Sequence, residues 1–203
     1  MLALKNQIYT LEEYLELDHA SEEKIEFWGG HIFTLAGVSE EHGQIEVNLT
    51  TLFSNEFRKK KKKCRVFPAN IRIKVPTYLP YRYPDLSALC GEAKFEKLGK
   101  QDLLVNPQLI IEILSDSTES FDRGDKFTYY KSIESFTEYV LIAQHRPHIT
   151  QYVKQADNSW SYKEINGVDN EIRFASVDCE MSLADIYEDV EFPENIFPFR
   201  LVE

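Results

Sequence analysis

The stretch NPQLIIEILSDST, residues 106–118, combines a short apolar run with one carboxylate at its centre. Asn-Pro precedes the run and Ser-Asp-Ser-Thr follows it, so turn residues bound it on both sides. Such a run is typical of a strand that is buried on both faces of a sheet. Glu112 interrupts it, and an ionised carboxylate that is buried without a partner is energetically costly. The chain must therefore give Glu112 a cation, hydrogen-bond donors or a shifted pKa.

Asp85 is the first candidate to share a site with Glu112. It follows Pro84 at the start of another strand-like segment, DLSALC, residues 85–90. If the two strands pair, their carboxylates meet, and such a pair favours a hard divalent cation, because Mg²⁺ prefers oxygen ligands and keeps several waters. We therefore expect a metal to be the partner of Glu112. The alternatives are that Asp85 only caps a turn, and that Glu112 either pairs with a buried arginine such as Arg72 or faces water at an edge position.

A lysine on the next predicted helix completes this site. The segment TESFDRGDKFTYYKSI, residues 118–133, has a helical pattern and carries Lys126. A metal between the carboxylates would polarise a phosphodiester and acidify a water molecule, while a lysine would stabilise the charge that develops on phosphorus. Lys126 is either a protonated charge stabiliser or, if burial lowers its pKa, a base. The simpler alternative is an i,i+4 ion pair with Asp122 on an exposed helix face.

The N-terminal part of the chain predicts a helix followed by a hairpin. Residues 10–13 have the threonine and glutamate of a capping box at the start of a short helix. Gly29 and Gly30 then join two strand-like segments, residues 24–28 and 31–37. A Gly-Gly pair between two such segments is a strong hairpin signal.

The rest of the chain alternates between helical and strand patterns. Ser39 begins the longest predicted helix, in which apolar residues recur at the spacing of one buried face. A period-two pattern over residues 64–75 predicts a strand, and the charged segment between residues 90 and 106 predicts a loop. Further strands are predicted at residues 138–144, 148–155, 159–165 and 172–177, and a last helix at residues 182–190.

This order of elements predicts an α/β (α+β) fold in which a mixed β-sheet is flanked by helices. A chain of 203 residues that is 43% hydrophobic can bury a proper core, and it has no internal repeat and no low-complexity linker. We therefore expect a single domain over residues 1–203. The chain has no P-loop, GxGxxG, GxSxG or HExxH motif, so nucleotide binding and serine hydrolase chemistry have no support.

The charge of the chain is strongly uneven. The net charge of −11 argues against a general attraction to polyanions, although it leaves room for a local basic site. The segment RKKKKKCR, residues 58–65, concentrates seven cations within eight residues. Its simplest interpretation is a solvated helix end, where cations complement the helix dipole.

Cysteine usage and the N-terminal sequence predict a soluble cytoplasmic protein. Cys64, Cys90 and Cys179 are odd in number, widely spaced and without a CxxC pair, so we expect reduced thiols rather than a disulfide framework or a zinc site. The first residues lack the basic and apolar regions of a signal peptide. No apolar run approaches the roughly 18 residues that a membrane span requires.

Four segments of the chain carry a family resemblance: RYPDLSALCG (82–91), NPQLIIEILSDSTESFDRGDKFTYYKSIESFTEYVLI (106–142), GGHIFTLAG (29–37) and RPHITQYVK (146–154). Together they resemble the Uma family of restriction-endonuclease-like proteins, which are members of the PD-(D/E)XK nuclease superfamily. The resemblance extends from Tyr9 to Phe192. By that resemblance, Asp85 and Glu112 bind the metal, and the backbone carbonyl of Ile113 completes the protein's share of the coordination.

The chain departs from the superfamily pattern two residues after Glu112, where Leu114 stands in place of a lysine. The resemblance implies that the lysine comes from the next helix instead, which offers Lys126. A side chain of that length can reach back from a neighbouring helix.

The resemblance also concerns the start of the long helix and the predicted strand that follows this helix. His42 stands where the family tends to have histidine, and Glu41 or Glu46 would be an outer-shell ligand. Asn70 stands where relatives often carry an acid. An exposed polar residue in a first helical turn also needs no function, so His42 has this simpler interpretation as well.

These observations lead to two functional hypotheses. The first is a Mg²⁺-dependent endonuclease, with Mn²⁺ as a substitute, that acts on DNA through Asp85, Glu112, Lys126 and His42. Cleavage of both strands would be made most simply by a symmetric homodimer. The second is a catalytically silent module that binds nucleic acid or protein and retains the nuclease fold, which the acidic net charge, Leu114 and Asn70 favour.

Overall fold

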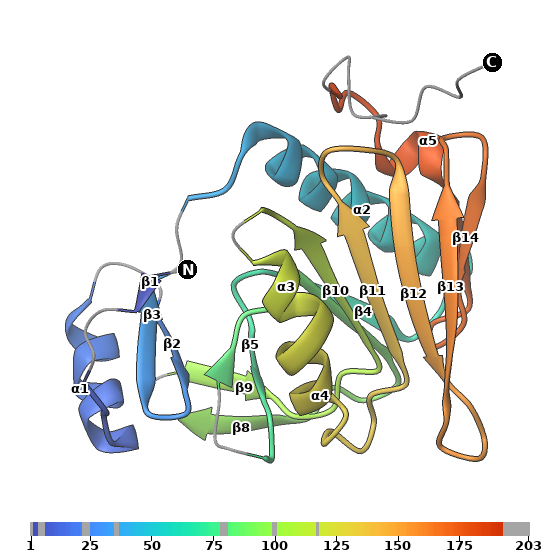
Figure 1. The fold of residues 1–203 in the computed structure, drawn as a ribbon. Helices are drawn as coiled ribbons and strands as arrows, with labels where there is room; N and C mark the ends of the chain where they lie inside the picture. The colour runs from blue at the N-terminus through green and yellow to red at the C-terminus, as the bar shows by residue number, and fades with distance from the viewer. Residues whose placement is uncertain are drawn as a thin grey trace.

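A computed structural model of the protein describes residues 2–3, 7–21, 25–34, 37–77, 81–98, 101–116 and 118–192. Three sheets and five α-helices organise this part of the chain, together with a π-helical segment, η1 (Figure 1). The fold is a mixed α+β architecture, as the sequence predicts. Within these residues, no helix is both long and apolar enough to cross a lipid bilayer.

A six-stranded mixed sheet forms the centre of the fold. Its strand order is β13-β12-β11-β10-β7-β4, in which β10 runs parallel to β11 and antiparallel to β7. Every residue of the predicted central strand, β10, is buried, including Glu112. The strands are β4 (Cys64–Pro68), β7 (Leu86–Cys90), β10 (Leu109–Leu114), β11 (Glu138–Ala143), β12 (His148–Lys154) and β13 (Trp160–Asn166).

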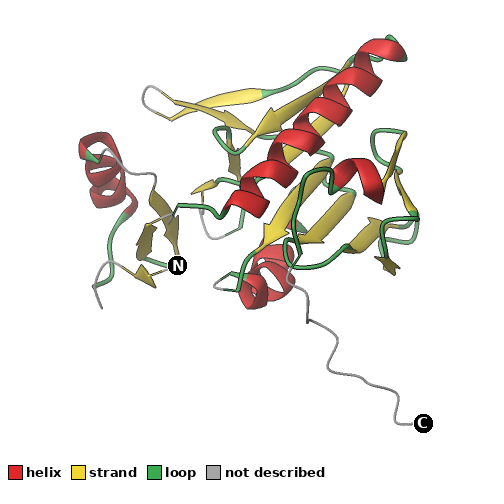
Figure 2. Ribbon diagram, turned by 90° about the horizontal axis from the view of Figure 1, so that it is seen from above, coloured by secondary structure: helices red, strands yellow, loops and turns green. Residues whose placement is uncertain are grey.

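Helices cover both faces of this sheet. On one face lies α2 (Glu40–Lys59), whose apolar residues pack against alternate residues of β10, Leu109 among them. The other face is covered by the crossover from β10 to β11 (Figures 1 and 2). Ile110 and Leu114 point to this second face. Because side chains alternate along a strand, Glu112 points there as well. The crossover consists of α3 (Glu119–Phe121), η1 (Asp122–Lys126) and α4 (Phe127–Tyr130).

A second, seven-stranded sheet carries the N-terminal hairpin, and α1 (Leu11–Ala20) packs on it. The capping box at Thr10 is present, and Gly29 and Gly30 form the hairpin turn with positive φ angles of 55° and 83°. The end of the predicted second hairpin strand, residues 35–36, lies outside the described residues. The strands are β1 (Leu2–Ala3), β2 (Ile25–Trp28), β3 (His31–Thr34), β5 (Arg72–Lys74), β6 (Tyr81–Arg82), β8 (Phe95–Leu98) and β9 (Gln101–Leu104).

The prediction of a loop between residues 90 and 106 is wrong, because this segment forms β8 and β9. Phe95 and most of β8 are exposed, so the strand lacks the apolar alternation that would reveal it. The predicted strand over residues 64–75 is also divided, since a turn at residues 69–70 separates β4 from β5. Each part then joins a different sheet.

The C-terminal part adds a two-stranded sheet and a short helix beside α2. The strands are β14 (Glu171–Phe174) and β15 (Cys179–Ser182). Ser182 caps the last helix as predicted, but α5 (Leu183–Ile186) is shorter than the predicted range of 182–190. Residues of both strands and of α5 pack against the same apolar cluster as α2.

The expectation of three reduced cysteines is wrong for two of them. Cys64 and Cys90 lie opposite each other in the ladder between β4 and β7, and they form a disulfide. They are 26 residues apart in the sequence, so only the pairing of the strands brings them together. Cys179 is a buried free thiol.

Candidate functional site

Glu112 lies in a buried cluster of charged and polar side chains. Its Oε2 is 2.8 Å from the Lys126 ammonium, and its Oε1 accepts a 2.8 Å hydrogen bond from the Tyr130 hydroxyl. The same ammonium lies 3.0 Å from Asp122 Oδ1. Glu112 and Asp122 are each 2% exposed and Lys126 is 5% exposed. Two carboxylates therefore share one ammonium inside the protein.

The partner of Glu112 in this structure is therefore Lys126, not the buried arginine considered as an alternative. Arg72 is buried, but it forms an ion pair with Asp18 and stacks over the ring of Tyr83. The distance from the Arg72 guanidinium carbon to the centre of that ring is 4.6 Å. Arg72 thus connects β5 to α1, away from Glu112.

Asp122 and Lys126 are the first and last residues of the π-helical segment η1. The wider turn of η1 lies between α3 and α4, and short π segments inside helices often occur at functional sites. Asp122 and Lys126 form the i,i+4 ion pair that is the simpler alternative for Lys126 in the sequence. The pair lies against the sheet, however, and not on an exposed helix face.

Burial and the surrounding charges together shift the pKa values in this cluster. Burial disfavours the Lys126 ammonium, but the carboxylates of Asp122 and Glu112 outweigh it and hold the pKa of Lys126 well above its usual range. Burial, opposed by Lys126 and reinforced by the negative charges of Asp122 and Asp85, raises the pKa of Glu112 well above its usual value. Lys126 therefore keeps its proton, which argues against its role as a base.

Asp85 lies next to Glu112 at the end of the paired strands. Ile111 pairs with Leu86 in the antiparallel ladder, and the next residues along the two strands are Glu112 and Asp85. Directly opposed residues of antiparallel strands project to the same side of a sheet. The structure thus brings the two predicted carboxylates to one end of the sheet, and the contribution of Asp85 to the pKa of Glu112 agrees with this.

The Asp85 carboxylate is held by two groups from different elements. Its Oδ2 accepts a 2.6 Å hydrogen bond from the backbone N–H of Ile113, and its Oδ1 is 3.2 Å from Nε2 of His42. His42 is buried in the first turn of α2, and Ser39 caps that turn by accepting a hydrogen bond from the His42 N–H. Burial opposes the imidazolium, but the Asp85 carboxylate outweighs it and raises the pKa of His42.

Other predicted site residues lie outside this cluster. Glu46 accepts a 3.4 Å hydrogen bond from the N–H of Ala69, so it connects α2 to the turn after β4. Asn70 is exposed in that same turn. Glu41 is half-buried in the first turn of α2. Leu114, where the superfamily pattern has lysine, is buried in an apolar cluster.

The sequence interpretation missed two members of the cluster. The sequence interpretation names Asp122 only as an ion-pair partner of Lys126. The i,i+4 spacing between the two residues is the signal that places Asp122 beside Lys126 in the cluster. Tyr130 packs in the core, as aromatic residues on a helix usually do, and it also donates its hydroxyl to Glu112. In the described part of the chain, no group of three or more His, Cys, Asp or Glu side chains is arranged to hold a metal ion.

Known proteins are similar to this chain in sequence and in fold. The chain is 33% identical to the Synechocystis sp. uncharacterized protein sll1609 over 175 residues, 86% of this chain and 97% of that protein. It is 29% identical to uncharacterized protein slr1290 of the same organism over 181 residues, 89% of this chain and 92% of that protein.

A solved structure, described as "a putative nuclease belonging to DUF820" from Anabaena variabilis, has a similar fold. Its TM-score is 0.69 at 18% identity, over 88% of this chain and 97% of that chain. The Uma2 family model, described as "Putative restriction endonuclease", matches residues 11–184, a range that includes every member of the buried cluster. The chain therefore belongs to the Uma2 family.

Proposed function

We propose that this chain is a divalent-metal-dependent nuclease that hydrolyses phosphodiester bonds of DNA at the cluster around Glu112. The observation that carries the proposal is the excess of buried acid, since Glu112 and Asp122 share a single lysine and the Asp85 carboxylate lies beside Glu112. Buried carboxylates are normally balanced by cations, so an excess supports a site that accepts a further positive charge. Family membership and the fold support the same proposal.

The side chains fit a hard divalent cation by their chemistry. Asp85 and Glu112 offer carboxylate oxygens, which Mg²⁺ prefers, and Mn²⁺ accepts the same ligands. Mg²⁺ commonly binds through one or two carboxylates together with waters and substrate phosphate, so the site does not need a third protein carboxylate. The backbone carbonyl of Ile113 stays a proposed additional ligand.

Each residue of the cluster has a separate role in the proposed reaction. When bound, the cation supplies charge that polarises the phosphodiester and makes a water molecule more acidic. Lys126, which holds its proton, stabilises the negative charge that develops on the phosphate oxygens. His42 orients Asp85 by contacting one carboxylate oxygen, while the Ile113 N–H holds the other. His42 is therefore a positioning residue.

Cleavage of supercoiled plasmid tests this proposal. Purified protein should convert the plasmid to nicked or linear DNA in Mg²⁺ or Mn²⁺ and not in EDTA. The variants Glu112→Gln and Asp85→Asn should lose this activity, whereas the double variant Arg82→Met/Glu26→Met, which removes another buried acid together with the cation that pairs with it, should retain it. Undiminished cleavage by Glu112→Gln would contradict the assignment.

The second candidate function is a silent binding module with the same fold. Leu114 at the position of the usual lysine favours it, as does the lack of a three-ligand group within the described residues. Metal-dependent stabilisation separates the two candidates, because a silent module without a metal site would gain no thermal stability from millimolar Mn²⁺.

We also propose that the active form is a symmetric homodimer, because two related sites would cut both strands of a duplex. Sedimentation velocity of the protein with and without a DNA duplex measures this directly. A single monomeric species under both conditions would contradict it.

A further inference from the structure

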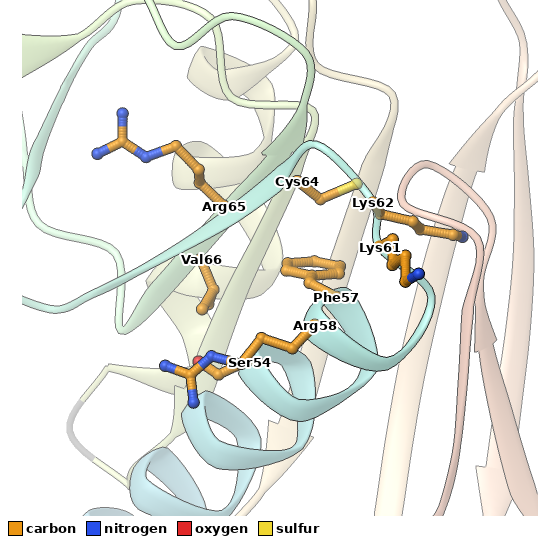
Figure 3. A pocket seen from close by; sticks show the side chains of 8 residues that line it. All are labelled: Ser54, Phe57, Arg58, Lys61, Lys62, Cys64, Arg65 and Val66. Atoms are coloured by element: carbon orange, nitrogen blue, oxygen red, sulfur yellow. The ribbon is translucent and has the colours of Figure 1, made fainter.

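The lysine-rich run after α2 lines a surface pocket that the proposed reaction does not use. The pocket has a volume of about 430 Å³. Figure 3 shows the ring of Phe57 near the centre, with the Arg58 side chain beside Ser54 and with Lys61 and Lys62 on the other side of the ring. An apolar floor is thus surrounded by cations.

Two of the cations that line the pocket, Lys62 and Arg65, contact other side chains. Lys62 Nζ lies 2.6 Å from a carboxylate oxygen of Asp178, and the Arg65 guanidinium stacks over Phe67 at 4.8 Å. Arg58 and Lys61 are exposed, and in the part of the chain that the structure describes neither forms an ion pair. The pocket therefore presents unneutralised positive charge on a protein whose net charge is −11.

One helix connects this pocket to the catalytic cluster. His42, which contacts Asp85, lies in the first turn of α2, and Arg58 lies in its last turn. At 1.5 Å per residue, these two positions are about 24 Å apart along the helix axis. This length corresponds to about seven base pairs at 3.4 Å each.

We propose that the pocket of Arg58 and Lys61 binds backbone phosphates of a nucleic acid, as a second contact that positions the substrate at a distance from the cleaved bond. The inference rests on the proposed function for its choice of ligand. A phosphodiester backbone carries one charge at each regular step, so it can occupy two separated cationic sites at once. Elsewhere on this acidic chain, the net charge repels the same polymer.

The test is the salt dependence of DNA binding without divalent metal, so that no cleavage occurs. Fluorescence anisotropy of a labelled 20-base-pair duplex would be measured over a range of salt concentrations for three proteins. They are the wild type, Arg58→Gln/Lys61→Gln, and the control Lys94→Gln/Lys163→Gln, which removes the same charge from two other exposed lysines.

Each phosphate contact contributes about −0.9 to the slope of log K against log salt, so the pocket variant should bind with a slope smaller in magnitude by about 2. The control should keep the wild-type slope, and the charge-preserving variant Arg58→Lys/Lys61→Arg should restore it.

An unchanged slope in the pocket variant would overturn the inference, even if plasmid cleavage is observed. A reduced slope would support it even if no cleavage is observed, and the failure would then belong to the nuclease proposal. If the pocket variant loses affinity for polyglutamate and not for duplex DNA, the pocket binds acidic peptides and the inference is wrong.

Discussion

Two of the buried acid–base clusters in the described part of this protein differ in their balance of charge. In the first, Glu26 of β2 meets Arg82 of β6, with 2.6 Å between Oε2 and the guanidinium. The other oxygen of Glu26 accepts a hydrogen bond from the N–H of Tyr83. In the second, Lys126 faces both Glu112 and Asp122.

The difference separates a structural ion pair from a candidate reactive site. One acid and one base leave no unbalanced charge at Glu26, so the first cluster needs nothing further. The second cluster has more acid than base. Burial raises the pKa of Glu112, and the negative charges of Asp122 and Asp85 raise it further against the opposing effect of Lys126. Burial alone does not distinguish the two, because Glu26 is 1% exposed and Glu112 is 2% exposed.

The largest expected effect on stability comes from breaking the ion pair between Glu26 and Arg82. Arg82→Met leaves Glu26 buried without its cation, and we expect the free energy of unfolding to fall by about 3–5 kcal/mol. The double variant Arg82→Met/Glu26→Met should recover most of that loss, because no charge remains buried. Urea denaturation measures both. A loss that persists in the double variant would show that packing, and not charge, dominates at this pair.

Lys126→Met should have opposite effects on metal binding and on catalysis. Loss of a donor to developing phosphate charge should slow cleavage by about 100-fold to 1,000-fold. Removal of the ammonium should at the same time tighten Mn²⁺ binding, because the carboxylates lose their competing cation. Plasmid cleavage rates and Mn²⁺ titrations test the two parts. Weaker Mn²⁺ binding in this variant would argue against competition between the lysine and the metal.

Removal of the disulfide should destabilise the protein and leave both clusters intact. Cys64→Ser/Cys90→Ser opens a cross-link between residues 26 apart, which chain entropy predicts to cost about 3 kcal/mol. Mn²⁺ should stabilise this variant by as much as it stabilises the wild type. Thermal unfolding with and without Mn²⁺ gives the comparison. Two titratable thiols at these positions in the unreduced wild type would contradict the cross-link.

The pH dependence of stability should reveal the excess acid at Glu112. Because its pKa in the folded protein is raised above 4.5, its contribution to stability is fully present below that pH and is lost as the pH rises through the folded pKa. Metal-free wild type should therefore lose stability relative to Glu112→Gln over this range, by at most about 1.4 kcal/mol per pH unit. Urea denaturation in EDTA at several pH values measures the difference. A constant difference would mean that Glu112 stays ionised throughout.

The smallest expected effect concerns His42. Its raised pKa means that its pairing with Asp85 stabilises the protein below pH 6.5 and that this contribution is lost as the pH rises through the folded pKa. His42→Gln should cost less than about 1 kcal/mol, and only on the acidic side. Urea denaturation of the wild type and of His42→Gln at pH 5.5 and at pH 9 measures this cost on the acidic and on the alkaline side. An equal cost at both values would assign His42 a packing role.

The sequence predicts the central part of the fold because its signals there are local. The apolar run around Glu112, the N-cap at Ser39 and the Gly29-Gly30 turn each depend on neighbouring residues, and all three are present in the structure. The sequence does not predict β8 and β9, because backbone pairing and not an apolar pattern along the chain defines these two strands. The division of residues 64–75 between two sheets likewise depends on tertiary contacts.

The candidate site could be predicted in part for the same reason. Asp85 and Glu112 stand out because a carboxylate beside apolar strand residues is unusual, and Lys126 follows from the family pattern. Asp122 lies buried at the start of the π-helical segment η1, and no short-range pattern in the sequence predicts this segment. The protonation of Lys126 depends on the number of carboxylates around it, which only the folded structure gives.

Calorimetric titration with Mn²⁺ tests the central claim most directly, since it compares the two clusters in one experiment. The wild type and the double variant Arg82→Met/Glu26→Met should both bind Mn²⁺, and free Mn²⁺ at 100 times Kd should raise the free energy of unfolding of each by about 2.7 kcal/mol. Glu112→Gln should show neither binding nor stabilisation. Equal Mn²⁺ binding by wild type and Glu112→Gln would contradict the assignment of the metal site to the cluster with excess acid.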